Sequence, residues 1–196
     1  MSNRGYCDPP SGRLLVMRSG SSIIRSAGIP KPIVIVDTRE QSPLPVFMNH
    51  GNWIGGERRC ALKTGDYSIE GMESLLSLER KSLTDIVACT VTNRKRFLAS
   101  CTRLSKFRWK AILIEATFED IKSGFEQFDI PSEVHPNAVT GTLDAIEAKF
   151  GIPILYTSTF RDLAAERAAS WLSKHFSYWW LETHRLGRVL IDHDKL

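Results

Sequence analysis

Two carboxylates and one amine are expected to share a small patch near the middle of the chain. Glu79 and Lys81 lie two positions apart in a segment with strand character, so both side chains point to the same face, about 7 Å apart. Asp66 lies on the preceding expected strand, and a hairpin can bring it across from Glu79. Because two carboxylates about 4 Å apart repel each other by roughly 4 kcal/mol at an effective dielectric constant of about 20, they need a cation between them.

The chemistry that this patch suits is hydrolysis of a phosphodiester. Hard oxygen ligands select Mg²⁺ or Mn²⁺ over zinc, and such an ion activates water, orients the phosphate and neutralises charge in the transition state. Lys81 would hold the attacking water or stabilise the added charge at phosphorus. The alternative is a set of surface ion pairs that merely neutralise neighbouring charges, formed by Glu79 and Asp85 with Arg80 and Lys81.

Further acidic residues follow other expected strands. Asp37 and Glu40 come after one β-branched run, and Glu115 ends another apolar run. Strand ends that converge on one edge of a sheet are where α/β proteins assemble their sites. We therefore expect these three carboxylates at the same edge as the patch.

The elements that must position these residues are strands at first, and then helices and strands in alternation. Buried apolar runs and a turn around Gly71 predict strands over residues 33–36, 66–69, 75–80, 111–114 and 153–156. Capping patterns and helical spacing predict helices from Ser82, over 93–105, from a cap at Asn137 to Phe150, and from about Arg161. This order implies an α/β fold with a mixed sheet covered by helices on both sides.

A run of basic residues from Arg94 to Lys110 contains no Asp or Glu, although the net charge of the chain is only +4. A stretch of one sign indicates binding to a polyanion such as nucleic acid, and the alternative is a solvated helix face. The residues expected to contact DNA phosphates, without reading the base sequence, are Arg94, Lys95, Arg96 and Arg103.

Length and composition favour one α/β domain with two tails. Of the 196 residues 42% are hydrophobic, and no apolar run approaches the roughly 20 residues that span a bilayer, so no membrane partner is expected. The four cysteines have no zinc-site spacing, which favours reduced thiols in the cytoplasm. We expect a flexible basic arm over 1–32, a folded domain over 33–176, and a segment over 177–196 that docks on the core or forms a dimer contact.

The spacing of the charged residues carries a stronger signal. Asp37-Thr-Arg39-Glu40 is followed by Gly65-Asp66, then by Glu79-Arg80-Lys81 with Asp85 four residues further on. Since each charged residue occurs at about 6–7%, the Glu-Arg-Lys-x-x-x-Asp portion arises by chance at roughly one start in 10⁵. The whole pattern resembles the signature of the XPF-type structure-specific endonucleases, which is Gly-Asp, a variable gap and Glu-Arg-Lys-x-x-x-Asp, with an upstream Val-Asp-x-Arg-Glu.

The resemblance looks continuous from Ile33 to about Lys174. It implies a restriction-endonuclease-like fold of three layers, α/β/α, around a central mixed sheet. It also implies a Mg²⁺- or Mn²⁺-dependent endonuclease that hydrolyses DNA near branches, flaps or junctions during repair, recombination or replication.

The resemblance also implies roles for the matching residues. Asp66 and Glu79 look like the main metal ligands, with Asp37 and Glu40 as additional ligands or the second-metal side. Lys81 would be the catalytic partner that positions the water.

Three more motif residues would support the site. Arg39 and Arg80 resemble arginines that pair with the carboxylates or the phosphate. Asp85, at a helix start, would anchor Arg80 or Lys81.

The chain departs from the family in two ways. Ser100 stands where the family usually has a glutamine, and only about 20 residues follow the last helix, too few for the tandem helix-hairpin-helix domain of eukaryotic and archaeal members. A homodimer and a heterologous partner therefore both stay open, and a compact domain suggests a bacterial nucleoid or, for a virus, the host cytoplasm. The rival interpretations are a non-cleaving DNA-binding partner subunit, and an exonuclease or resolvase of the same fold.

Overall fold

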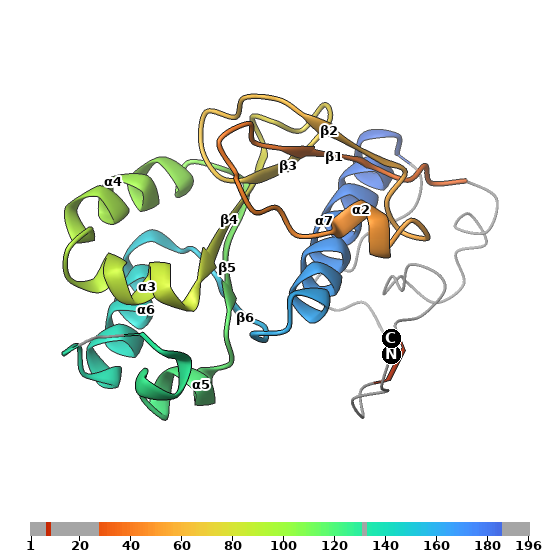
Figure 1. Ribbon diagram of the computed structural model, residues 1–196. Coiled ribbons are helices and arrows are strands. Elements are labelled where there is room, and N and C mark those ends of the chain that lie inside the picture. The colour runs from red at the N-terminus through yellow and green to blue at the C-terminus, as the bar shows by residue number, and fades with distance from the viewer. Residues whose placement is uncertain (1–6, 9–27, 131–132, 186–196) are drawn as a thin grey trace, which may run out of the picture.

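A six-stranded sheet lies at the centre of the computed structural model, which describes residues 7–8, 28–130 and 133–185 (Figure 1). The strands are β1 (Ile33–Val36), β2 (Gly56–Arg59), β3 (Tyr67–Ile69), β4 (Leu76–Ser82), β5 (Trp109–Glu115) and β6 (Ile154–Tyr156). Their order across the sheet is β2-β1-β3-β4-β5-β6. β3 is antiparallel to β1 and β4, while the other neighbours are parallel, so the sheet is mixed, as the sequence predicts.

Helices cover both faces of this sheet (Figure 1). The first face carries α2 (Val46–Asn49) and α7 (Arg161–Thr183), and the second carries α3 (Leu83–Thr90), α4 (Arg94–Leu104), α5 (Phe118–Lys122) and α6 (Pro136–Phe150). A 3-10 turn, η1 (Glu126–Phe128), follows α5. The predicted three-layer α/β/α architecture is therefore confirmed. No helix in the described residues has the length and apolar character needed to cross a membrane.

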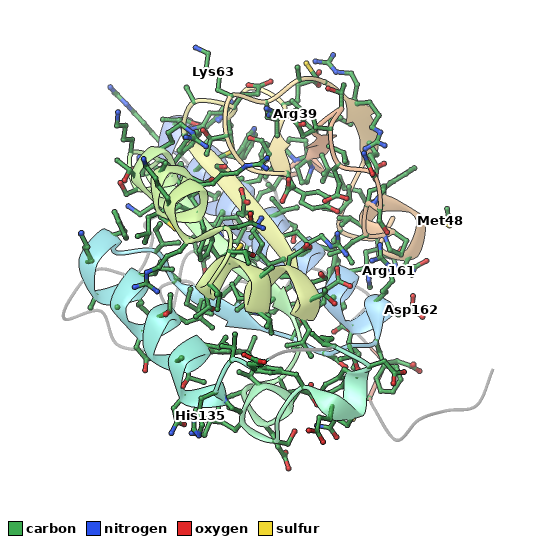
Figure 2. All side chains as sticks on the ribbon, turned by 60° about the vertical axis from the view of Figure 1, so that its left-hand side comes forward. Arg39, Met48, Lys63, His135, Arg161 and Asp162 are labelled. Atoms are coloured by element: carbon green, nitrogen blue, oxygen red, sulfur yellow. The ribbon has the colours of Figure 1, made fainter. Side chains whose placement is uncertain are left out.

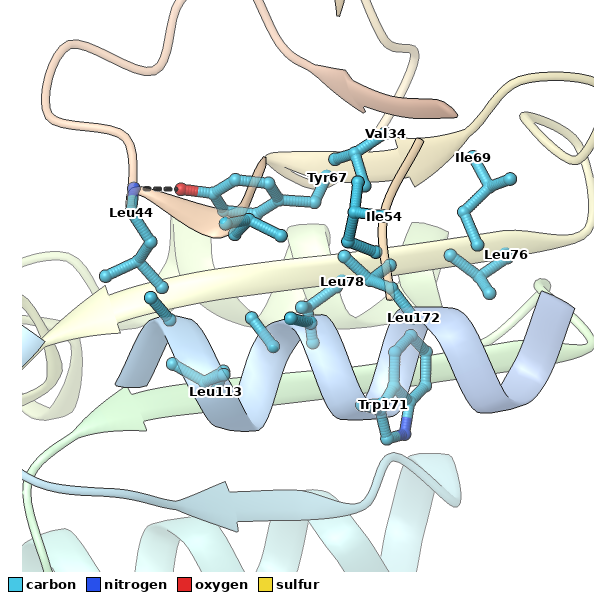
Figure 3. Close-up of a cluster of buried hydrophobic side chains, with 14 of the residues drawn as sticks. Val34, Leu44, Ile54, Tyr67, Ile69, Leu76, Leu78, Leu113, Trp171 and Leu172 are labelled. Atoms are coloured by element: carbon cyan, nitrogen blue, oxygen red, sulfur yellow. Dashed lines mark hydrogen bonds between the residues drawn. The ribbon is translucent and has the colours of Figure 1, made fainter. Parts of the chain in front are cut away.

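The core on the first face joins α7 to the strands (Figure 3). Tyr67 and Leu172 are fully buried there, and the Tyr67 hydroxyl accepts a hydrogen bond of 2.7 Å from the amide of Leu44. This bond fixes the loop that follows β1. Trp179 and Trp180 also pack against this cluster, so this part of the 177–196 segment docks on the core, which is one of the two alternatives expected for it.

The core on the second face joins α3, α4, α5 and α6 to β5 and β6. Ile112 and Ile114 of β5 point into it, together with Phe97 of α4 and Ile146 of α6. Because side chains alternate along a strand, the neighbouring Leu113 belongs to the first core instead.

The C-terminal end of β4 extends beyond the two cores, and its side chains there are charged. Leu76 and Leu78 belong to the first core, so the alternation places Arg80 on the α7 side. The same alternation places Glu79 and Lys81 on the side of α3 and α4. The strand thereby carries charged side chains to both faces where its hydrophobic part ends.

Some elements differ from the prediction. The segment after Asp37 contains α2 and β2, neither of which was predicted; three of the four β2 residues are exposed, so this edge strand has no apolar pattern to detect. α5 and η1 were also not predicted. The cap of α6 is His135, whose Nδ1 accepts from the Asn137 amide, and the expected cap at Asn137 is wrong because Pro136 already occupies the first turn.

The C-terminal boundary of the folded domain lies further along the chain than expected. α7 continues through residue 176, where a boundary was expected, as far as Thr183, so residues 177–183 are its last turns. Most of the expected basic arm, including the pieces at 14–17 and 23–24, and residues 186–196 lie outside the described residues.

Candidate active site

A tight turn places Asp66 opposite Glu79. Gly65 has a φ of +81°, and a Cβ there would collide with Ser77 Oγ, so this position needs glycine. The turn lets the Asp66 amide donate to the carbonyl of Leu78 at 2.9 Å. Tyr67 pairs with Leu78 in an antiparallel register, so one step further along Asp66 faces Glu79, as the hairpin prediction requires.

Backbone and side-chain contacts hold the pair in place. The amide of Arg80 donates to Asp66 Oδ2 at 2.7 Å, and Lys81 Nζ forms an ion pair with Glu79 Oε1. The side chains of Glu79 and Lys81 are 12% and 19% exposed, so this ion pair is accessible only from the adjoining cleft. The structure thus brings together the two carboxylates and the amine that the spacing predicts.

The charges of this group are not balanced. Burial, and after it the negative charge of Glu79, raises the pKa of Asp66 to about 7. Burial alone would lower the pKa of Lys81, but the charge of Glu79 and its hydrogen bond outweigh burial and raise it. Two carboxylates therefore share one ammonium, and at neutral pH the site stabilises a proton or another cation.

The donor set fits a small divalent ion. Among the described residues, no three His, Cys, Asp or Glu side chains are arranged to hold a metal ion, and the carboxylates that the strand register brings opposite each other are those of Asp66 and Glu79. Mg²⁺ is usually held by one or two carboxylates together with waters and substrate phosphates. A pair of oxygen ligands facing an open cleft meets that requirement without a complete protein cage.

Asp37 is committed to other partners. Its Oδ1 accepts from Arg39 Nε at 2.7 Å, and its Oδ2 accepts from Arg39 Nη2 at 3.0 Å and from the Leu62 amide at 2.6 Å. The hydrogen bond from Arg39 lowers the pKa of Asp37 to about 2. The four-carboxylate set expected from the sequence is therefore not assembled here, because both oxygens of Asp37 are occupied.

The Arg39 side chain is 70% exposed and reaches the charged group from the β1 side. Asp37 is its main partner, and the negative charges of Asp66 and Glu79 also raise the pKa of Arg39. The predicted pairing of Arg39 with a site carboxylate is thus present, with Asp37 as that carboxylate.

Glu40 and Arg80 belong to a second charged group on the α7 side of β4. Arg80 Nε donates to Glu115 Oε1, and Arg80 Nη1 lies 3.5 Å from Glu40 Oε1. Arg161 Nη1 lies 3.2 Å from Glu115 Oε2. We call these four residues, Glu40, Arg80, Glu115 and Arg161, the Arg80 network.

The Asp85 carboxylate caps a helix and, among the described residues, does not hold a basic side chain. The carboxylate accepts from the Ser82 amide at 3.4 Å and the Asp85 amide donates to Ser82 Oγ at 3.1 Å, which closes a capping box at the start of α3; Ser82 Oγ also donates to the carboxylate at 2.8 Å. In the part of the chain that the structure describes, no ion pair joins Asp85 to Arg80 or Lys81, so the predicted anchor is not formed.

A cleft of about 480 Å³ opens over the site. It is lined by Asp37, Arg39, Glu40, Gln41, Lys63, Thr64, Gly65, Asp66, Glu79, Arg80, Lys81, Asp85, Cys89, Asn93, Arg96, Phe97, Ser100 and Arg103. Arg96, Ser100 and Arg103 lie four and three residues apart, so they share one face of α4, which forms a wall of the cleft. Figure 2 shows Arg39 and Lys63 on the loops of the β1–β3 region, and His135 at the opposite end of the molecule.

Only two of the four predicted DNA contacts line this cleft. Arg94 Nη1 donates to Thr142 Oγ1 of α6 at 3.2 Å, and Lys95 is exposed outside the lining, because the helical repeat turns both away from Arg96 and Arg103.

Sequence reasoning missed several residues of the site. Glu115 was expected at this edge of the sheet, but its pairing with Arg80 and Arg161 was not predicted, and Arg161 was predicted only as the start of a helix, since the Glu115–Arg161 pairing joins positions 46 apart. Lys63 and Asn93 carry no motif. Ser100, noticed as a departure from the family, does lie in the cleft.

The mixed sheet, the two helical layers and the Gly-Asp…Glu-Arg-Lys group together define the class of XPF-type nuclease folds. The model of the ERCC4 domain matches residues 36–166, well over half of the chain, so the chain belongs to the ERCC4 domain family. The predicted resemblance is confirmed.

Two solved structures share this fold. XPF from Aeropyrum pernix superposes with a TM-score of 0.56 at 20% identity, covering 79% of this chain and 69% of that one. The same protein in complex with DNA gives a TM-score of 0.54 at 17% identity, covering 84% and 70%. A protein of Methanocaldococcus jannaschii whose name describes an ATP-dependent RNA helicase is 29% identical over 135 residues, which are 68% of this chain and only 15% of that protein.

Proposed function

We propose that this chain is a divalent-metal-dependent DNA endonuclease that hydrolyses phosphodiester bonds. The observation that carries the proposal is the Asp66–Glu79 pair, held beside Lys81 at the floor of a cleft with two arginines on its α4 wall. Two carboxylates with one ammonium leave room for the charge of a cation, and the arginines suit a polyanion. Membership of the ERCC4 domain family and the fold shared with a protein solved in complex with DNA support DNA as the substrate.

The carboxylates, the lysine and the arginines of the cleft have different roles in this mechanism. Asp66 and Glu79 would hold Mg²⁺ or Mn²⁺, which supplies Lewis-acid polarisation of the phosphate and a stronger nucleophile. Lys81 Nζ, fixed by Glu79, orients the attacking water and stabilises the charge that develops on the phosphate oxygens. Arg96 and Arg103 hold the flanking phosphates without reading the bases.

The cleft favours an enzyme over a DNA-binding subunit that does not cleave. A DNA-binding subunit that does not cleave is the second candidate, and it would have no use for two buried carboxylates that face a phosphate-binding cleft. Here both acids and the lysine are present, with Glu79 paired to Lys81 and Asp66 held by the amide of the intervening Arg80, so the site retains what hydrolysis needs. Branched, flap or junction DNA as the substrate follows from the resemblance and is part of this proposal. A homodimer or heterologous partner, and the cytoplasmic location that the cysteine pattern favours, belong to it as well.

Cleavage of a panel of labelled DNAs tests the proposal. Flap, fork, Holliday, linear duplex and single-stranded substrates are incubated with Mg²⁺, Mn²⁺, Ca²⁺ or EDTA. The wild-type protein should cut with Mg²⁺ or Mn²⁺ and be inactive with EDTA. Glu79→Gln should lower the rate at least about 10³-fold, because it removes a ligand of the ion that stabilises the transition state.

The exposed Glu73 supplies the matched control, since Glu73→Gln makes the same chemical change away from the cleft and should cut normally. Asp66→Asn and Glu79→Gln should bind DNA as tightly as wild type or more tightly in EDTA, because negative charge facing phosphate is removed. Cutting by Glu79→Gln at the wild-type rate, or cutting that ignores EDTA, would overturn the metal assignment. DNA binding without cleavage of any substrate would favour the second candidate.

A further inference from the structure

Arg161, on the first turn of α7, joins three distant parts of the chain. Its Nη2 donates to the carbonyls of Ser42 and Pro43, at 2.8 Å each, and its Nη1 contacts Glu115 at the end of β5. Arg161 lies on the α7 side of the molecule, next to Asp162, in Figure 2. One guanidinium therefore ties α7 both to the loop after β1 and to the sheet.

The contacts of Arg161 close a ring. Glu115 accepts from Arg80 as well as from Arg161, and Arg80 reaches Glu40. Glu40 Oε1 accepts from the amide of Ser42 at 2.7 Å, which returns to the loop that Arg161 holds. Each member of the ring is thus held from two sides.

The ring is balanced in charge and mostly buried. It contains two glutamates and two arginines, with side chains of Glu40, Glu115 and Arg80 only 8–11% exposed. Arg161 is 37% exposed, so it closes the ring from the solvent side. Arginine suits this position because one nitrogen of its planar guanidinium can bind a carboxylate while another binds two carbonyls. A single lysine ammonium cannot make all of these contacts.

Arg80 connects this ring to the candidate active site. It lies between Glu79 and Lys81 in β4, and its own amide donates to Asp66. A displacement of Arg80 therefore moves both carboxylates of the pair and the lysine. Displacements of about 1 Å in such groups can reduce rates by about 10²-fold.

We propose that Arg161 is a positioning residue for the candidate active site: by holding Glu115 and the loop after β1, it fixes Arg80 and, through the Arg80 amide, Asp66. This inference rests on the proposed nuclease function. Arg161 itself touches neither the carboxylate pair nor the cleft lining.

Three variants test the proposal. Arg161→Ala opens the ring, Arg161→Lys keeps the charge but cannot make every contact, and Arg167→Ala removes an exposed arginine from the same helix as a matched control. Each is assayed about 20 °C below its own Tm, so that the measured rate is that of folded protein.

Two readouts separate positioning from mere support of the fold. We expect Arg161→Ala to lower kcat by about 10- to 100-fold with the KM for DNA within about threefold of wild type, since the residue is not a DNA contact. Arg161→Lys should fall between Arg161→Ala and wild type. In ¹⁵N NMR spectra of the metal-free protein, the Nε–H signal of Arg80, which reports its bond to Glu115, should shift or broaden in Arg161→Ala and stay unchanged in Arg167→Ala.

Several results would overturn the inference. A lowered Tm with unchanged kcat and an unchanged Arg80 signal would make Arg161 a support of the fold only. A raised KM with unchanged kcat would make it a DNA contact. A wild-type protein that cuts no DNA with Mg²⁺ or Mn²⁺ would remove the proposed function and this inference together, whereas wild-type cutting matched by Arg161→Ala would remove the inference alone.

Discussion

The C-terminal end of β4 carries two charged groups back to back, and their electrostatics differ. On the α7 side, the Arg80 network matches two glutamates with two arginines. On the α3 and α4 side, Asp66 and Glu79 have Lys81 as their ammonium partner, and the pKa of Asp66 rises to about 7. One strand therefore supplies a balanced cluster that supports the fold and an unbalanced one that can accept a cation.

This difference follows from what each face can reach. The α7 side offers Arg161 from a helix end and the loop after β1, so the acids there find cations and backbone donors. The other side opens into the cleft, where Lys81 pairs with Glu79, while Arg96 and Arg103 lie on the wall and, in the described residues, no ion pair ties these two arginines to the carboxylates. Burial without full compensation is a common feature of functional sites.

The largest effect that would sharpen the comparison is on Lys81. Lys81→Ala should reduce the cleavage rate by about 10²–10⁴-fold, the range typical of a group that moves or orients a proton in the transition state. Because the ion pair with Glu79 lies at the cleft, the Tm of the metal-free protein should change little. The measurements are single-turnover cleavage with saturating Mg²⁺ and thermal unfolding followed by circular dichroism.

A large fall in the Tm of Lys81→Ala would contradict this prediction. It would mean that the Asp66, Glu79 and Lys81 group supports the fold, as the Arg80 network does. Lys174→Ala, which removes a lysine of α7 that donates to Ser170 Oγ and does not line the cleft, is the control and should cleave normally.

The second effect contrasts the same substitution on the two faces. Glu115→Gln removes one charge from a balanced, buried network and should lower the free energy of unfolding by about 2–4 kcal/mol. Glu79→Gln removes one of two carboxylates that repel each other, and the free energy of unfolding should stay within about 1 kcal/mol of wild type. Urea unfolding in EDTA measures both. Equal losses in the two variants would break the distinction between the faces.

This contrast also shows how far the sequence could lead. The period of two along the strand and the hairpin with its turn around Gly71 were enough to predict the Asp66, Glu79 and Lys81 group, because those relations are local or lie within one hairpin. The partners of Arg80 depend on Glu115 and Arg161, 35 and 81 positions further along, and no local pattern specifies them. Asp85 was assigned to a base although its Ser-x-x-Asp pattern already favoured a cap.

The charge run before β5 illustrates the same limit. Its composition predicted a phosphate-binding surface, but only the phase of α4 decides which cations face the cleft. Arg96 and Arg103 do, whereas Arg94 bonds to α6. The spacing of Phe97 and Leu104 gives the side of α4 that packs against the core, but which flank of that side meets the cleft is decided by tertiary packing.

The third effect is on pH dependence, where two acids of the same cleft should act in opposite directions. The pKa of Asp66 is about 7 in the folded protein against 3.8 ordinarily, so between these values the folded state holds a proton that the unfolded state has lost. The free energy of unfolding of the metal-free protein should therefore fall as pH rises from about 4 to about 7. Asp66→Asn should remove this fall.

Asp37 has the reverse sign. Its pKa is about 2 when folded, so its contribution is complete above its ordinary pKa of 3.8 and is lost as pH falls from about 4 to about 2. Asp37→Asn should therefore lower stability at neutral pH and flatten the acid limb. Urea titrations from pH 2.5 to 8 in EDTA measure both, and identical profiles for the two variants would contradict the assignment of a balanced and an unbalanced carboxylate.

The smallest effect concerns the two arginines of α4 that line the cleft. Arg96→Ala and Arg103→Ala should each weaken DNA binding by a few-fold to about tenfold, and each should reduce the slope of log K against log salt by about one, because each removes one phosphate contact. Arg94→Ala is the matched control on the same helix: its side chain is held by Thr142, so its salt slope should stay near that of wild type. Fluorescence anisotropy in Ca²⁺ from 50 to 300 mM salt would measure the slopes. If Arg94→Ala lost as much as Arg96→Ala, the phosphates would follow the outer surface of α4, and the Asp66–Glu79 pair would no longer lie on the path of the DNA.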